Sequence, residues 1–208
     1  LNENDTMGIV AVSDGANEDK IDISISNFNK LGFNVVETES VRCSNLLVST
    51  DGKTRAEEFI ELWQNRNVKY ILSARGGEFL MEMLPYLDEY SNMIRISEPK
   101  WVQGYSDPSL LLFYLTTKFE IATIHAENLS EFAMDLGNYH KCLKNTINFL
   151  KSKDNEFVEE SFDKYQLTEF EEGNFRGYNL TEDSKCVLFG SNDKNISVTS
   201  KMTQGVSA

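Results

Sequence analysis

Short apolar runs alternate along the first 125 residues with stretches in which apolar residues recur every three or four positions. Recurrence at helical spacing predicts helices, as for Ile21, Ile25 and Phe28, which share one face. The short runs predict buried strands, and they cover residues 7–13, 33–36, 68–73, 101–104 and 121–124. Strands that alternate with helices predict an α/β fold with a doubly wound, mostly parallel sheet of the Rossmann or flavodoxin-like type.

Several residues mark the expected helix ends. Gly32 is a stop signal for the first helix, and Thr54 is the expected cap of the second. The segment 110–115 lacks a polar face and predicts a helix in the core, too short to cross a membrane. A further helix is expected over 143–150, with His140 exposed at its start.

Small and polar residues follow four of the predicted strands. These positions are Ser13 to Gly15, Ala74 to Gly77, Ser106 and His125. The carboxyl ends of parallel strands meet at one edge of a sheet, where ligands bind. We therefore expect these loops to converge on one site, with Ser13, Gly76 and His125 lining its pocket.

The segment Gly104 to Asp107 carries the strongest chemical signal. A serine at a sharp strand-to-helix turn is typical of a nucleophile, with the Asp107 amide placed to stabilise an oxyanion. Pro108 occupies the position where the full nucleophile motif has a second glycine. The tetrapeptide alone fits helix capping by Ser106 better than nucleophilic catalysis. A Ser–His–Asp grouping of Ser106 with His125 is open but has no support from spacing.

Charge and cysteine content exclude several function classes. The net charge is −13, from 33 acidic and 20 basic residues, which would repel a nucleic-acid backbone. No apolar stretch is long enough to span a membrane, and the acidic start does not resemble a signal peptide. Three separated cysteines indicate neither a metal site nor a disulfide framework. We expect a cytoplasmic protein that binds neither nucleic acid nor membranes.

The composition and the hydrophobic periodicity of the chain change near residue 151. Charge rises and helical periodicity fades, while 171–174 resembles a turn and 186–190 a strand. We interpret 1–155 as an N-terminal α/β domain, and 156–208 as a linker with the beginning of an incomplete C-terminal domain.

Six segments in register resemble one known family. They are Gly8 to Ser13, Ser73 to Gly77, Leu84 to Asp88, Pro99 with Lys100, Gly104 to Asp107, and Thr123 to His125. In order and spacing they are similar to the LD-carboxypeptidase family of serine peptidases, which includes the microcin C immunity peptidases.

The resemblance implies that Ser106 is the catalytic nucleophile and that the amides of Gly77 and Asp107 form the oxyanion hole. It implies a metal-free and cofactor-free hydrolase that cuts an amide next to a free carboxylate, as in the L–D bond of murein peptides during recycling. The immunity branch instead cuts peptide–nucleotide or acyl–adenylate antibiotics. Members are often homodimers.

The same resemblance implies that a glutamate and a histidine complete the triad from a C-terminal domain. Neither residue maps onto this sequence, so we expect the chain alone to be inactive. A different class remains open, in which the chain is a non-catalytic module that binds a peptide or a nucleotide. A coding region that continues beyond Ala208 with a Glu and a His would favour the enzyme.

Overall fold

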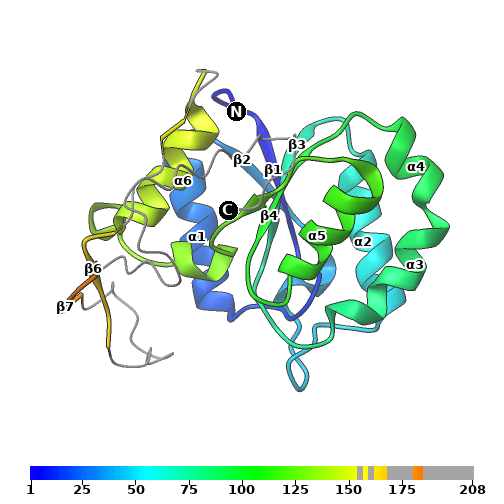
Figure 1. The fold of residues 1–208 in the computed structure, drawn as a ribbon, viewed down its shortest axis with the longest axis horizontal. Coiled ribbons are helices and arrows are strands. Elements are labelled where there is room, and N and C mark those ends of the chain that lie inside the picture. The colour runs from blue at the N-terminus through cyan, green and yellow to red at the C-terminus, as the bar shows by residue number, and fades with distance from the viewer. Residues whose placement is uncertain (154–156, 159–161, 168–179, 185–208) are drawn as a thin grey trace, which may run out of the picture.

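A five-stranded parallel sheet forms the centre of the computed structural model, which describes residues 1–153, 157–158, 162–167 and 180–184 (Figure 1). Its strands are β1 (Thr6–Val10), β2 (Asn34–Glu37), β3 (Val68–Ser73), β4 (Trp101–Gly104) and β5 (Ile124–His125). They are ordered β2-β1-β3-β4-β5, and each neighbouring pair is parallel. This order is the flavodoxin-like one and confirms the predicted doubly wound sheet. A separate antiparallel pair joins β6 (Lys164–Tyr165) to β7 (Glu182–Asp183).

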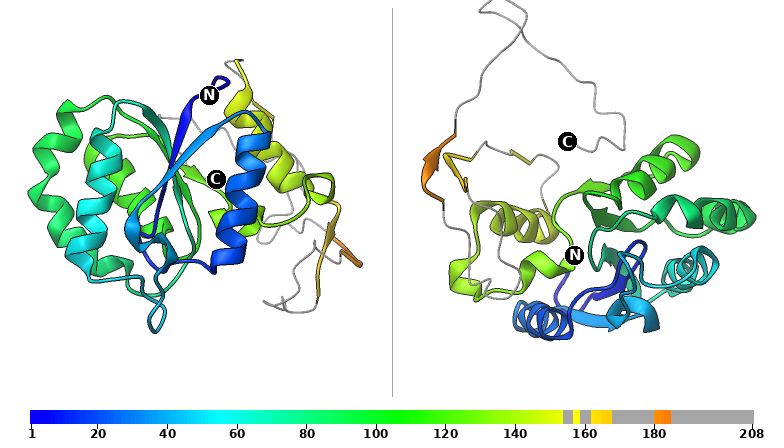
Figure 2. Two further views of the ribbon diagram at one scale, coloured as in Figure 1. Left: turned by 180° about the vertical axis from the view of Figure 1, so that it is seen from behind. Right: turned by 90° about the horizontal axis from the view of Figure 1, so that it is seen from below.

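Helices cover both faces of the sheet. The α-helices are α1 (Glu18–Lys30), α2 (Gly52–Gln64), α3 (Leu84–Glu89), α4 (Ser91–Ile96), α5 (Ser109–Phe119) and α6 (Lys141–Lys151). Four 3-10 turns are η1 (Glu39–Arg42), η2 (Leu80–Met83), η3 (Leu129–Phe132) and η4 (Leu136–Asn138). Helices α1 and α6 lie on one side of the sheet, and α2 to α5 on the other (Figures 1 and 2). None of the helices among the described residues is long and apolar enough to cross a bilayer.

The apolar core is divided by the sheet, because successive strand residues point to opposite faces. Ile9 packs with the residues under α1 and α6, whereas its neighbour Val10 packs with those under α2 and α5. Strand β3 divides in the same way, with Leu72 on the first face and Ile71 on the second. Burial on both faces explains why these strands are continuous apolar runs in the sequence.

The strand order places the candidate loops next to one another. The chain winds outward in opposite directions from β1 and β3, so their exits form the switch point at which such sheets bind ligands. Val10 pairs with Ser73 at the carboxyl ends of these strands, and Gly104 pairs with His125 further along the same edge. The predicted convergence of loops after β1, β3, β4 and β5 on one edge is thus confirmed.

The predicted cap of α2 is wrong. Asp51, not Thr54, is the N-cap, and its carboxylate accepts from the Thr54 amide at 3.0 Å and from the Thr54 hydroxyl at 2.7 Å. The helix therefore begins two residues before Thr54, whose hydroxyl donates to the cap from inside the first turn. Both residue types are good caps, and the pattern of apolar residues does not separate them.

The predictions for the fifth strand and for α5 also need correction. The fifth strand covers Ile124–His125 and not 121–124, because the Ile121 amide donates back to the Leu115 carbonyl and completes the end of α5. Helix α5 is not buried all round, since Phe113 is 67% exposed. The expected turn at 171–174 and strand at 186–190 lie outside the described residues.

Candidate active site

Ser106 lies at the sharp turn between β4 and α5, with a left-handed backbone of φ +64°. Such a conformation destabilises a non-glycine residue by about 1–2 kcal/mol and is typical of a serine nucleophile on a strand-to-helix elbow. Its side chain is exposed. The N-cap of α5 is Pro108, without a side-chain cap, so the interpretation of Ser106 as a helix cap is wrong.

Two glycines allow neighbouring segments to approach this elbow. A Cβ atom on Gly104 would lie 2.8 Å from Pro108 Cβ and 3.2 Å from Ser73 Cβ. A Cβ atom on Gly76 would lie 3.2 Å from both Cβ and Oγ of Ser106. The loop after β3 therefore passes directly beside the candidate nucleophile. A role for Gly76 in lining a pocket stays a prediction.

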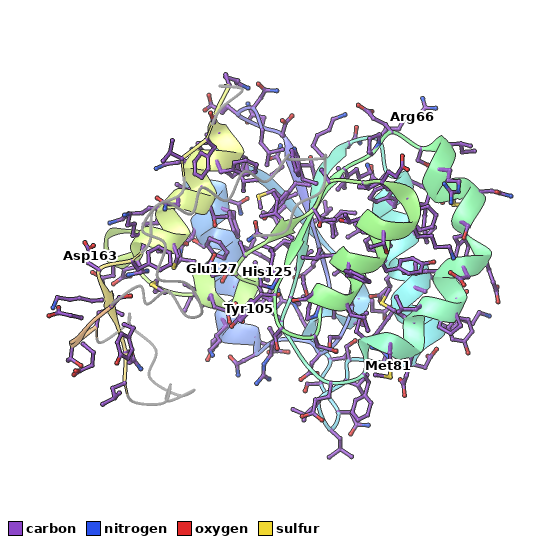
Figure 3. The ribbon with its side chains drawn as sticks, viewed as in Figure 1. Arg66, Met81, Tyr105, His125, Glu127 and Asp163 are labelled. Atoms are coloured by element: carbon purple, nitrogen blue, oxygen red, sulfur yellow. The ribbon has the colours of Figure 1, made fainter. Side chains whose placement is uncertain are left out.

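Asn128 anchors the elbow from the side of β5, a role that the sequence did not reveal. Its buried side chain accepts from the Tyr105 amide at 3.2 Å. The Tyr105 hydroxyl donates to Glu131 at 3.1 Å, and burial raises the pKa of both side chains. Tyr105 and Glu127, which precedes Asn128, lie close to His125 in the view of Figure 3.

The carboxylate of Asp107 points back into the protein. One of its oxygens accepts from the Ser13 hydroxyl and also from the Leu80 amide, the latter at 2.9 Å. Ser13 is fully buried at the end of the segment that follows β1, and it directly adjoins Gly77. The structure thus brings Ser13, Gly77 and Asp107 together, although 94 residues separate Ser13 from Asp107.

The amides of Gly77 and Asp107 donate to no group in the described part of the chain. Free amides beside an exposed serine are what an oxyanion site requires. Their role in an oxyanion hole stays a prediction.

Gly77→Ala is expected to destabilise the protein by about 1–3 kcal/mol, because a crowded backbone has no room for a methyl group. The new Cβ would lie 2.7 Å from the Leu47 carbonyl oxygen and closer still to Ser13 Oγ. Urea unfolding would measure the loss. Gly137→Ala is the matched control, since nothing lies within 4 Å of the position of its Cβ, and it should leave the midpoint nearly unchanged. Equal midpoints for the two variants would contradict the crowding.

A groove of about 770 Å³ adjoins the site on the side of α1. Its walls include Arg75, directly before Gly76, and Arg42. Arg75 pairs with the buried Asp14 at 3.6 Å, so its charge is partly compensated. The groove gives a ligand room beside the loops that follow β1 and β3.

Neither histidine of the chain contacts Ser106. His125 Nε2 lies 2.9 Å from the Ser109 hydroxyl at the start of α5, and the grouping of His125 with Ser106 is absent from the described hydrogen bonds. His140 is half-buried, contrary to the expectation of exposure, because its Nδ1 accepts from the Cys142 amide as the N-cap of α6.

Protonation of His140 is expected to weaken this cap. Burial lowers the pKa of His140 below its ordinary value, so the folded state favours the neutral ring. A lowered pKa means that its contribution to stability is complete above about pH 6.5 and is lost as the pH falls below that value. His140→Asn, which caps without titrating in this range, should reduce the loss in urea unfolding between pH 7 and pH 5. His140→Ala should lower stability by about 1 kcal/mol at pH 7. An unchanged pH dependence in His140→Asn would contradict this role.

No three His, Cys, Asp or Glu side chains gather among the described residues in a way that could hold a metal ion. The described residues place at this edge an exposed serine hydroxyl, the amides of Gly77 and Asp107, and a groove lined by Arg42 and Arg75.

The segment that carries this site matches a known family. A family model described as the LD-carboxypeptidase N-terminal domain matches residues 7–126, more than half of the chain. The chain belongs to the LD-carboxypeptidase family. The match covers β1 from its second residue, β2 to β5, and the segments that carry Ser13, Gly77 and Ser106, whereas Asn128 lies just beyond it. The predicted resemblance is confirmed.

Relatives of this LD-carboxypeptidase family member include the microcin C7 self-immunity protein MccF of Escherichia coli. It is 34% identical over 98 residues, which make up 47% of this chain and 28% of MccF. A structure of MccF in complex with aspartyl sulfamoyl adenosine matches with a TM-score of 0.77 at 24% identity, covering 88% of this chain and 56% of that one. An MccF-like protein from Streptococcus pneumoniae in complex with AMP matches with a TM-score of 0.67 at 22% identity, covering 80% and 51%. The chain spans about half the length of these solved relatives, and they share its fold.

Proposed function

We propose that the protein is a serine-type carboxypeptidase of the LD-carboxypeptidase kind, which hydrolyses an amide next to a free carboxylate, as in the L–D bond of murein peptides. The observation that carries the proposal is the exposed Ser106 with its left-handed backbone, directly after a central strand of the sheet. Membership of the family supports it.

In the proposed reaction, Ser106 Oγ attacks the carbonyl carbon of the scissile amide while a base takes the hydroxyl proton. The amides of Gly77 and Asp107 donate to the oxyanion that forms. The carbon–nitrogen bond then breaks, the departing amine takes up a proton, and water hydrolyses the acyl-serine ester.

The proposal places the base outside these 208 residues. His125 and His140 are the two histidines of the chain, and their ring nitrogens contact Ser109 and Cys142. An isolated serine hydroxyl is a weak nucleophile. The 208 residues alone are therefore expected to lack measurable hydrolysis, whereas the full natural protein that contains them is active.

Three dipeptide amides that share one L-residue test the proposal on the full natural protein. The first carries a D-residue with a free carboxylate, the second the same residue as its carboxamide, and the third the L-isomer. Cleavage of the first compound, with much slower release from the other two, is expected. Equal cleavage of all three would contradict the proposed specificity, and binding without cleavage would favour the non-catalytic module.

A second candidate is hydrolysis of a peptide–nucleotide or acyl–adenylate conjugate of the microcin C type. The similarity to E. coli MccF, at 34% identity over 98 residues, favours it. An aminoacyl sulfamoyl adenosine in the same assay separates the candidates, because its cleavage in place of the L–D amide would select this one. The homodimer and the cytoplasmic location stay predictions, and light scattering would test the dimer.

A further inference from the structure

The strained backbone at Ser106 is held from both sides. A left-handed residue other than glycine persists when the surrounding structure over-determines it. On the N-terminal side, Asn128 accepts from the Tyr105 amide. On the C-terminal side, the only described partners of the Asp107 carboxylate are the Ser13 hydroxyl and the Leu80 amide.

The contacts of Asp107 tie the elbow to two other loops of the site. Ser13 follows β1, and Leu80 follows β3 by way of Gly77. Because the Asp107 carboxylate and the Asp107 amide are attached to the same Cα atom, fixing the carboxylate also limits where the amide points.

Ser13 has a second contact that Leu80 lacks. A Cβ atom on Gly77 would overlap Ser13 Oγ, so the Gly77 backbone lies directly against this hydroxyl. Asp14 Cβ is also within 3.1 Å of that Cβ position. A single buried side chain thus separates and spaces the two segments that carry the candidate oxyanion amides.

We propose that Ser13 is a positioning residue that sets the distance between the Gly77 and Asp107 amides, through its contact with Gly77 and its hydrogen bond to the Asp107 carboxylate. The proposal rests on the proposed function, in which these two amides bind the oxyanion. Ser13 does not touch the reacting atoms, and it acts through the two backbone segments that it separates.

The expected kinetic effect of Ser13→Ala is confined to the chemical step. Displacement of an oxyanion donor by a fraction of an ångström weakens interactions made in the transition state and leaves ground-state binding intact. We expect kcat to fall roughly 10- to 100-fold and KM to stay within about twofold. Ser24→Ala is the matched control, since Ser24 is equally buried and its hydroxyl donates to the Leu129 carbonyl at 2.9 Å, away from the elbow.

Variants of Asp107 provide the second arm of the experiment. In Asp107→Asn the amide oxygen still accepts from Ser13 and Leu80, so most of kcat should be retained. Asp107→Ala removes the acceptor and should lower kcat about as much as Ser13→Ala. The loss of kcat in the double variant Ser13→Ala/Asp107→Ala should be smaller than the product of the two single losses, because both changes remove the same hydrogen bond and only Ser13→Ala also removes the contact with Gly77.

Amide hydrogen exchange in the substrate-free protein tests the contact independently of catalysis. The Leu80 amide should exchange at least about tenfold faster in Ser13→Ala and in Asp107→Ala than in the wild type. Its exchange rate should be unchanged in Ser24→Ala. The proposal would be overturned if Ser13→Ala kept the wild-type exchange rate at Leu80 together with the wild-type kcat. A rise in KM as large as the fall in kcat would also overturn it. If the wild type cleaves no substrate, the proposed function fails, and the exchange rates alone decide whether Ser13 holds Asp107.

Discussion

Ser106→Ala is expected to lower kcat/KM of the full natural protein by at least about 10⁴-fold for the L–D amide, because the variant cannot form the acyl-enzyme. Gly76 and Asp107 keep their positions around residue 106, so substrate binding should be largely retained. Steady-state kinetics and calorimetric titration of a non-cleaved substrate analogue would measure the two quantities.

The stability of variants at residue 106 provides a second test that does not depend on activity. With φ +64° at residue 106, glycine has no steric penalty, whereas alanine keeps it. Ser106→Gly should therefore be as inactive as Ser106→Ala but more stable by about 1 kcal/mol in urea unfolding. Full activity in either variant would remove Ser106 from the mechanism. Equal stability of the two would show that the left-handed backbone is not strained.

Arg55→Met is expected to destabilise the protein by about 3–5 kcal/mol, the largest effect on stability that we predict. Arg55 is fully buried in α2, and its guanidinium donates to the Val12 carbonyl at 3.2 Å and to the Phe79 carbonyl at 3.0 Å. It also donates to Glu82 at 2.9 Å. Methionine fills similar space but leaves two carbonyls without their donor, and these carbonyls directly precede Ser13 and Leu80.

The matched control is Lys53→Met on the same helix. Lys53 is exposed and pairs with Glu57 at 3.7 Å, so its loss should change stability by less than about 0.5 kcal/mol. Arg55→Lys should recover little of the stability that Arg55→Met loses, because one ammonium cannot reproduce the forked geometry of the guanidinium. Urea midpoints at constant slope would measure all three variants. A loss in Arg55→Met as small as that in Lys53→Met would contradict a structural role for Arg55.

Several features of the protein were determined by the sequence alone. The strands β3 and β4 begin and end where the apolar runs predicted, because burial on both faces requires a continuous apolar segment. The alternation of strands and helices fixed the doubly wound topology and, with it, the shared edge of Ser13, Gly76, Ser106 and His125. The family followed from six motifs in register along the chain, and the match over residues 7–126 confirms it.

The tertiary structure decided how Ser106 is held. Local sequence allowed a cap or a nucleophile at this position, and the start of α5, with Pro108 as its N-cap and no side-chain cap, excluded the cap. The residues that support the turn at Ser106 are polar or charged, as Arg55, Asp107 and Asn128 are. Sequence patterns assign residues of these types to the surface. Their partners lie up to 94 residues away, as for Ser13 and Asp107. Hydrogen bonds over such separations depend on how the loops at the sheet edge meet, which local periodicity does not encode.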